Sequence, residues 1–280
     1  MSGAACRTLF DAPRIKLGEL TCPAGGPDWG KANVMGRLAN IAFPRTSAVI
    51  VRSGRPPVLA NANHVLVYDP HQEYSRSPVD GRGWRCVFLA VDEDVLSECA
   101  AAPADGPSRR HAYVLQHLAC EEAESPRPDP LRIEELLYHL LAAAVESVGP
   151  QVPHAARRAR TRRVHRELVE DAKRVLTVRM SEHVSLDTLA GELYTSPYHL
   201  ARLFRAHTGY TLHAYRSELR LRCALDRLPA YRGNLTGLAH ELGYASLSHF
   251  SDSFCRAFGT RPSEPTQTRT ILEAGARAPA

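Results

Sequence analysis

An internal repeat in the last hundred residues limits the folds open to this chain. Leu189-Ala-Gly-Glu-Leu193 recurs as Leu238-Ala-His-Glu-Leu242, and Ser196-Pro-Tyr-His199 recurs as Ser246-Leu-Ser-His249 after a one-residue slip. Each copy has an apolar helix face, a short turn, and a serine suited to begin a second helix. Two short helices joined by a tight turn make a helix-turn-helix, so the repeat predicts two such units.

The second helix of the first copy carries its own boundary signals. Pro197 suits the first helical position, and Gly209 suits a left-handed helix end. Leu200, Leu203 and Phe204 lie on one side and are predicted to bury against the first helix. In a helix-turn-helix, the second helix enters the DNA major groove with its N-terminal residues toward the base edges.

One helix is predicted between the two copies, from Leu212 to Leu228. At 1.5 Å per residue it spans about 25 Å. That length can hold two recognition helices about one DNA turn, ~34 Å, apart on the same face of a duplex. A single copy is a weak signal, because any helical hairpin can mimic it, whereas two copies in one basic stretch are a strong one.

Charge separates the two halves of the chain, whose net charge is +5. Residues 155–280 hold 20 Lys and Arg against 12 Asp and Glu, whereas residues 1–154 hold 15 against 18. The basic C-terminal part favours a polyanionic partner. Most of these cations are arginine, whose planar fork can bind phosphate or guanine through two hydrogen bonds. GC-rich codons give the same arginine excess. The positions of the arginines must therefore decide whether this part of the chain binds nucleic acid.

The N-terminal part has a different pattern, with short β-like runs at 47–52, 64–68 and 86–91. Turn sequences separate these runs at 54–57, 69–71 and 80–83. Short strands between such turns predict an antiparallel sandwich or barrel rather than a parallel α/β sheet.

Two helices are predicted after these strands, over 109–124 and 129–148. The second has an apolar face that recurs at helical spacing. Such a face is either core or a helix-to-helix dimer seam. Core is the more common role of such a face. The sharper hypothesis is a dimer seam, which we assign to the residues Leu137, Leu140, Leu141 and Ala144.

Val184 to Pro265 resembles the DNA-binding domain of the AraC/XylS family of bacterial transcription regulators. The resemblance rests on Ser185-Leu-Asp-Thr-Leu-Ala190, Ser196-Pro-Tyr-His-Leu-Ala-Arg-Leu-Phe204, Gly243-Tyr-Ala-Ser-Leu-Ser-His-Phe250 and Phe254-Cys-Arg-Ala-Phe-Gly-Thr-Arg-Pro-Ser263. It implies a C-terminal all-α domain with two helix-turn-helix motifs. A looser likeness, centred on 64–89, implies an N-terminal cupin-like antiparallel β-barrel with helices. The expected fold class is therefore α+β multidomain.

The resemblance also implies a domain plan and a function. The plan is an effector-sensing and dimerisation domain over 1–150, a basic linker over 151–163, a DNA-binding domain over 164–270 and a flexible tail over 271–280. The implied function is a sequence-specific transcription regulator whose two recognition helices enter successive major grooves. Its implied partners are double-stranded DNA, RNA polymerase, an unknown small-molecule effector and a second copy of the chain.

The expected location is the bacterial cytoplasm, on the nucleoid and away from the membrane. No apolar run reaches the ~18 residues of a membrane span, and residues 1–10 lack the apolar core of a signal peptide.

Side chains that face away from the core of each recognition helix are the candidate DNA contacts. The resemblance implies base contacts at Tyr198, Ala201 and Arg202 in the first unit, and at Leu247, Ser248, Ser251 and Asp252 in the second. Phosphate contacts are expected at Ser196, His199, Arg205, Ser246, His249, Arg256 and Arg261. An arginine fork on guanine gives about 1–3 kcal/mol of discrimination, although Arg202 on phosphate is an alternative. His199 and His249 recur in the repeat, so packing against the turn is an equal alternative for them.

Asp252 departs from the pattern of the family, where an arginine commonly occupies this place. A carboxylate repels phosphate and can only accept a hydrogen bond, for instance from cytosine N4. The second unit is therefore expected to bind weakly or to read DNA shape. Alternatively, Asp252 forms an ion pair that positions Arg256 four residues later.

Two alternatives to this reading involve cysteines or metals. The cysteines are scattered without CxxC spacing, which favours free thiols in a reducing cytosol: Cys6, Cys22, Cys86, Cys99, Cys120, Cys223 and Cys255. His64, His71 and Glu73 lack the paired H-x-H of metal-binding cupins, so neither a metal nor a cofactor is predicted. A thiol- or metal-responsive regulator, or a catalytic cupin with a helical accessory domain, remains open. No motif of a nucleophile elbow, phosphate loop or zinc hydrolase favours an enzyme.

Overall fold

The computed structural model describes residues 3–92, 94–95, 105–147 and 159–264. They fall into two compact units, one before Gln151 and one from Gln151 to Pro265. The expected boundary at 150, linker residues 151–158, the tail over 271–280 and Cys99 lie outside the described residues. Residues 159–163 begin helix α4 (Ala159–Val178), so this end of the expected linker is helical. Among the described helices, none is long and apolar enough to cross a membrane.

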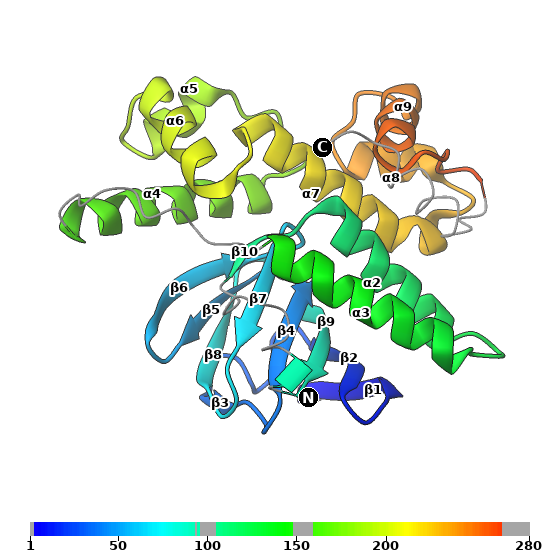
Figure 1. Cartoon of the computed structure of the whole chain (residues 1–280). Helices are drawn as coiled ribbons and strands as arrows, with labels where there is room; N and C mark the ends of the chain where they lie inside the picture. The colour runs from blue at the N-terminus through cyan, green and yellow to red at the C-terminus, as the bar shows by residue number, and fades with distance from the viewer. Residues whose placement is uncertain (1–2, 93, 96–104, 148–158, 265–280) are drawn as a thin grey trace. The chain divides into compact units, whose positions relative to one another are not determined.

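The first unit is a two-sheet antiparallel β-barrel (Figure 1). Its described strands are β1 (Ala5–Asp11), β2 (Ile15–Cys22), β3 (Asn33–Val34), β4 (Ala39–Pro44), β5 (Ala48–Arg52), β6 (Arg55–Ala60), β7 (His64–Tyr68), β8 (Glu73–Pro78), β9 (Trp84–Val91) and β10 (Gly106–Pro107). One sheet has the order β1-β2-β9-β4-β7-β10 and the other has the order β3-β8-β5-β6. The three predicted strands are confirmed as β5, β7 and β9.

Side chains from both sheets meet inside the barrel. Ile50 of β5, Leu66 of β7 and Trp84 of β9 meet in one buried cluster. The prediction of a turn over 54–57 is wrong in part, because Pro56 and Pro57 belong to β6. Strand β6 lies at the edge of its sheet, where a residue without an N–H breaks no ladder hydrogen bond.

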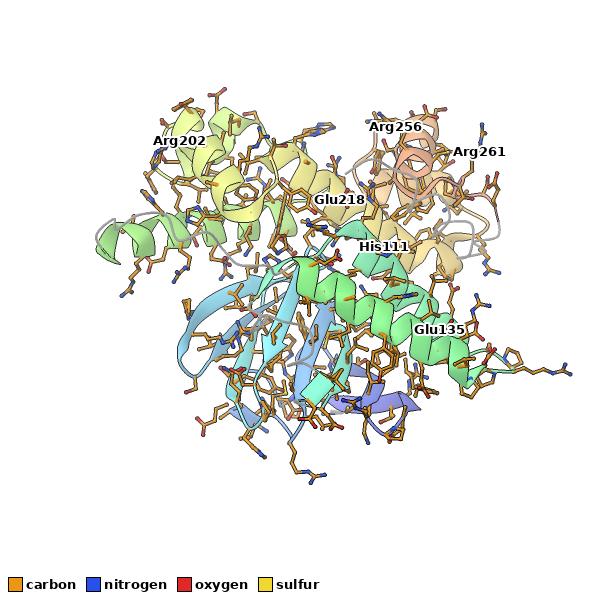
Figure 2. The ribbon with its side chains drawn as sticks, in the orientation of Figure 1. His111, Glu135, Arg202, Glu218, Arg256 and Arg261 are labelled. Carbon is orange, nitrogen blue, oxygen red and sulfur yellow. The ribbon has the colours of Figure 1, made fainter. Side chains whose placement is uncertain are left out.

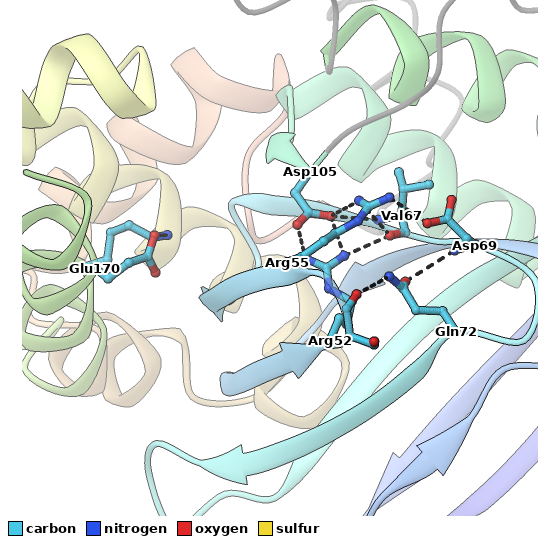
Figure 3. A network of polar contacts seen from close by, with 9 residues as sticks. Arg52, Arg55, Val67, Asp69, Gln72, Asp105 and Glu170 are labelled. Carbon is cyan, nitrogen blue, oxygen red and sulfur yellow. Dashed lines mark hydrogen bonds and ion pairs between the residues drawn. The ribbon is translucent and has the colours of Figure 1, made fainter. Parts of the chain in front are cut away.

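A buried arginine with its own carboxylate ties the sheets to the start of β10 (Figure 3). The Arg52 side chain is fully buried and forms an ion pair with Asp105. Its Nη1 donates to the carbonyl oxygen of Val67 at 2.8 Å, and the Val67 N–H donates to Asp105 at 3.0 Å. Asp105 therefore neutralises a charge that is costly to bury alone.

Helices α2 (Arg110–Ala123) and α3 (Pro130–Ser147) pack against each other, α2 also against β1 and α3 against β2. The residues of the expected dimer seam are all buried in this packing, at 0–2% exposure: Leu137, Leu140, Leu141 and Ala144. The predicted seam is therefore wrong, because these side chains are core within one chain. A homodimer through another surface stays a prediction.

The second unit is all helical. It consists of α4, α5 (Leu186–Glu192), α6 (Pro197–Thr208), α7 (Leu212–Arg227), the 3-10 helix η1 (Leu228–Tyr231), α8 (Leu235–Glu241) and α9 (Leu247–Phe258). In Figure 1, α5 and α6 lie at one end of α7, and α8 and α9 lie at the other. The expected α+β class is confirmed, with antiparallel sheets in the N-terminal part and helices in the C-terminal part.

Candidate functional site

Both predicted helix-turn-helix units are present, and their recognition helices have matching caps. Ser196 begins α6 and accepts a hydrogen bond from the His199 N–H at 3.2 Å. Ser246 begins α9 and accepts from the His249 N–H at 3.1 Å. The left-handed glycines Gly209 and Gly259 end the two helices, with φ of 74° and 73°. The serine hydroxyls act as N-caps, which satisfy donors that a helix start leaves free.

Apolar side chains fix each recognition helix against its own first helix. In the first unit these side chains are Leu189, Ala190, Leu200, Leu203 and Phe204, all buried. In the second they are Leu238, Ala239, Phe250, Phe254 and Phe258. The Phe204 ring also packs edge-on against Tyr215 of α7 at 5.3 Å, which anchors the first unit to the connecting helix. The outward faces of α6 and α9 are thereby held in place.

The outward face of α6 presents the predicted side chains to solvent. Tyr198 is 78% exposed, Arg202 and Arg205 are exposed, and Ala201 is half-buried. Arg202 points outward in Figure 2. Among the described residues, no carboxylate forms an ion pair with Arg202 or Arg205. Both guanidinium groups are free to bind an anion.

The outward face of α9 carries less positive charge. Ser248 and Asp252 are exposed, whereas Leu247 and Ser251 are half-buried. Arg256 donates its Nε to the main-chain oxygen of Asp252 at 3.3 Å. Within the part of the chain that the structure describes, the Asp252 carboxylate makes no ion pair with Arg256. The alternative in which an ion pair to Asp252 positions Arg256 is therefore wrong.

The two repeated histidines pack against aromatic rings. His199 lies edge-on to His165 of α4, with ring centroids 5.5 Å apart. His249 lies edge-on to Tyr244 in the turn before α9, at 5.3 Å. These contacts favour the packing role for both histidines, and their contact with phosphate stays a prediction. Arg261 is exposed just beyond Gly259 (Figure 2).

The segment between α4 and α5 joins the two helix-turn-helix units, a role that no sequence pattern indicated. Arg220 of α7 donates to the Met180 carbonyl at 2.5 Å, and its guanidinium lies 5.7 Å from the Tyr244 ring centroid. Arg216 of α7 donates to the Glu182 carbonyl at 3.2 Å. This segment thus contacts both α7 and the turn of the second unit, and it fixes one unit relative to the other. Arginines on a helix look like surface residues in a sequence, so no local signal pointed to them.

The turns of the two units share an unusual backbone conformation. Tyr194 and Gly243 follow the first helix at matching places in the repeat, with φ of 52° and 78°. Tyr194 is 98% exposed. A Cβ on Gly243, by contrast, would lie 2.1 Å from the Ser181 oxygen. The first turn is open to solvent and the second is closed against the segment between α4 and α5.

The cysteines of the barrel unit are poor nucleophiles. Burial raises the pKa of Cys86 to about 12 and of Cys120 to about 11. Burial also raises the pKa of Cys22 and Cys6. The thiolate is the reactive form, so these thiols react slowly near neutral pH. The six described cysteines are free thiols.

The raised pKa values of these thiols lead to a prediction that tests the thiol-responsive alternative. Iodoacetamide at pH 7, followed by peptide mass spectrometry, is expected to label Cys22 and Cys86 only after the chain is unfolded. DNA affinity is expected to be unchanged by mild peroxide. Rapid labelling of native Cys86, together with lost DNA affinity on oxidation, would instead establish thiol sensing.

The candidate metal ligands of the sequence analysis do not come together. His64 is buried, and its Nδ1 lies 3.2 Å from the Asn61 side-chain oxygen. His71 adopts a left-handed turn conformation, with φ of 57°. Over the described ranges, no three His, Cys, Asp or Glu side chains gather as a metal-binding group.

Comparison with solved structures gives only a remote likeness. ToxT from Vibrio cholerae O395 aligns over 93% of this chain and 99% of its own, with 9% identity and a TM-score of 0.35. A TM-score this low does not establish a shared arrangement.

Comparison of sequences is more informative for the C-terminal part. A family model described as a helix-turn-helix domain matches residues 189–268. The HTH-type transcriptional regulator GlxA of Rhizobium meliloti is 35% identical over 154 residues, which cover 54% of this chain and 43% of GlxA. The regulatory protein SoxS of Escherichia coli is 29% identical over 100 residues, which cover 36% of this chain and 94% of SoxS.

A third relative, the HTH-type transcriptional activator RhaS of Pectobacterium carotovorum, is 35% identical over 82 residues, or 29% of each chain. The chain spans less than half the length of GlxA and RhaS. The residues that the family model matches include most of α5 and all of α6 to α9. Residues 189–268 of the chain are therefore an AraC-type helix-turn-helix domain, similar to the domains of these transcription regulators.

Proposed function

We propose that this chain is a sequence-specific transcription regulator that inserts α6 and α9 into successive major grooves of one duplex. Helix α7 of 16 residues separates the two recognition helices and spans about 24 Å. The barrel unit binds an effector that changes the affinity for DNA, and the DNA-bound protein acts with RNA polymerase. The place of action is the bacterial cytoplasm, on the nucleoid.

One observation carries the proposal. Two helix-turn-helix units with the same serine caps and glycine ends lie at opposite ends of α7, and the first presents two unpaired arginines to solvent. A single helical hairpin occurs in many proteins without DNA. A repeated one, in the basic part of the chain and with free guanidinium groups on its outward face, has the chemistry of a DNA-reading surface.

The general test is the dependence of binding on salt. The full chain is titrated against duplex DNA of random sequence between 50 and 200 mM NaCl. Affinity is expected to fall steeply, because each neutralised phosphate releases a counterion. Absence of salt-dependent binding to any duplex would refute the proposal.

Arg202→Ala is expected to weaken binding to a selected duplex by about 1–3 kcal/mol and to relax specificity at one base position. The reason is that Arg202 is the exposed arginine nearest the start of α6. The measurement is the affinity for a duplex selected from a random pool and for single-base variants of it. Arg127→Ala, which removes the same charge from an exposed loop of the barrel unit, is the control and is expected to change little. A loss that is equal for every base variant would assign Arg202 to phosphate.

Asp252→Ala is expected to raise affinity for random DNA, because an exposed carboxylate on α9 repels phosphate. The measurement is binding to selected and random duplexes at two salt concentrations. Glu135→Ala, on an exposed position of α3 (Figure 2), removes a like charge away from the recognition helices and serves as control. A selective loss on the selected duplex alone would show that Asp252 reads a base.

A further inference from the structure

A second arginine is buried in the barrel, and it lacks a carboxylate. Arg76 of β8 is 2% exposed and lies opposite Ile50 of β5 in the sheet. Its guanidinium carbon lies 5.7 Å from the Tyr74 ring centroid. Nε and Nη1 have no hydrogen-bond partner. Across the described residues, no Asp or Glu forms an ion pair with Arg76.

Comparison with Arg52 shows how unusual a buried arginine without a carboxylate is. Both arginines belong to the same four-stranded sheet and both are buried. Arg52 has Asp105 and the Val67 carbonyl as partners. Burial of an unpaired charge carries a large free-energy cost, so a buried guanidinium normally has an anion beside it. Arg76 is therefore the buried cation of this sheet whose anion is not supplied by the described residues.

The surroundings of Arg76 fit the body of a small organic molecule. The Tyr74 ring packs edge-on against Tyr68 at 5.2 Å, and Ile50 and Trp84 belong to the same interior cluster. Trp29 and Met35 lie against this cluster and are only partly buried. The Gly30 N–H donates to the Arg76 carbonyl at 2.9 Å, so the loop that carries Trp29 runs beside this strand.

We propose that the barrel interior binds a small organic carboxylate, with an aromatic or short alkyl body, through the guanidinium of Arg76. A charge-assisted hydrogen bond from arginine to a carboxylate is strong, and it satisfies the N–H groups that burial leaves unpaired. The tyrosine and tryptophan rings supply contact area for the body of the ligand. The inference rests on the proposed role of the barrel as the effector-binding unit, and it names the chemical class of the effector.

The first test uses the full chain without DNA. Benzoate and hexanoate are each titrated against their neutral amides, benzamide and hexanamide, by calorimetry and thermal unfolding, at a constant ionic strength set with NaCl. At least one carboxylate is expected to bind and to raise Tm, and its amide is expected to bind at least tenfold more weakly. Binding of neither carboxylate, or equal binding of acid and amide, would overturn the inference.

The second test uses matched variants. Arg76→Gln is expected to weaken carboxylate binding at least tenfold without lowering the Tm of the free protein, because it removes an uncompensated buried charge. Arg52→Gln is the control and is expected to lower Tm, because it removes the buried ion pair and leaves Asp105 with the more distant Arg55, at 3.9 Å. Should Arg76→Gln not fold, Arg76→Lys keeps the charge and is expected to retain a preference for acid over amide. Unchanged carboxylate affinity in any folded Arg76 variant that lacks the charge, or loss of the preference in Arg76→Lys, would contradict the proposal.

Affinity for DNA is measured on the same samples. A chain that binds the carboxylate through Arg76 but binds no duplex refutes the proposed function and supports this inference. A chain that binds DNA but no carboxylate refutes this inference alone.

Discussion

Replacing Leu137 and Leu141 together with lysine is expected to unfold the barrel unit rather than to produce a folded monomer. Both leucines are at most 2% exposed, where α3 packs on α2 and on β2. Removing one buried leucine side chain costs about 2–5 kcal/mol, and an unpaired buried charge adds to that cost. A typical domain has a free energy of unfolding of roughly 5–15 kcal/mol. The cost of the double change therefore removes most or all of that stability.

The measurement is urea unfolding followed by far-UV circular dichroism, with the mass in solution determined by light scattering. Leu131→Lys is the matched control, because Leu131 lies on the same helix and is 69% exposed. It is expected to change stability by about 0.5 kcal/mol or less. A double variant that stays folded and becomes monomeric, from a dimeric parent, would restore the seam to this face of α3.

Gly243→Ala is expected to destabilise the helical unit by about 2–5 kcal/mol. Two effects add at this position. The backbone has a φ of 78°, and a side chain in the left-handed region costs about 1–2 kcal/mol. The new Cβ would also lie 2.1 Å from the main-chain oxygen of Ser181, and forcing atoms into packed space costs about 1–3 kcal/mol.

The chain contains a control that separates these two effects. Gly209 has a φ of 74° but open space where a Cβ would lie, so Gly209→Ala is expected to cost only the backbone part, about 1–2 kcal/mol. Tyr194, at the matching place in the first turn, shows that a side chain is tolerated there when nothing faces it. Thermal unfolding of both variants measures the two effects separately. Equal losses for Gly243→Ala and Gly209→Ala would mean that the contact with Ser181 does not hold the second turn.

The helix-turn-helix units were predictable because their signals are local. Ser196, Pro197 and Gly209 each act within a few residues of their place in the chain, through caps and backbone preferences. The repeat then supplied an independent copy of the same signals. Three of the strands were likewise predictable from runs of β-branched residues, as in Ala48–Arg52.

What the sequence left open depends on contacts between distant residues. The leucine face of α3 has the same spacing whether its partner is a second chain or α2, so periodicity alone does not distinguish core from seam. Strand β8 contains Glu73 and Arg76, and its polar residues hide it from a search for apolar runs. Arg220 reaches a carbonyl 40 positions earlier in the chain. Such a contact is set by the tertiary fold and has no signature in the neighbouring sequence.

The central claim is that α6 and α9 read one duplex together. Its most direct measurement is selection of duplexes from a random pool by the full chain, followed by hydroxyl-radical footprinting of the enriched DNA. The account predicts two protected blocks on one face of the duplex, about 10–10.5 base pairs apart, with Arg202→Ala weakening recognition in only one of them. Enrichment of a single short block that Arg202→Ala leaves unchanged, or no enrichment at all, would contradict it.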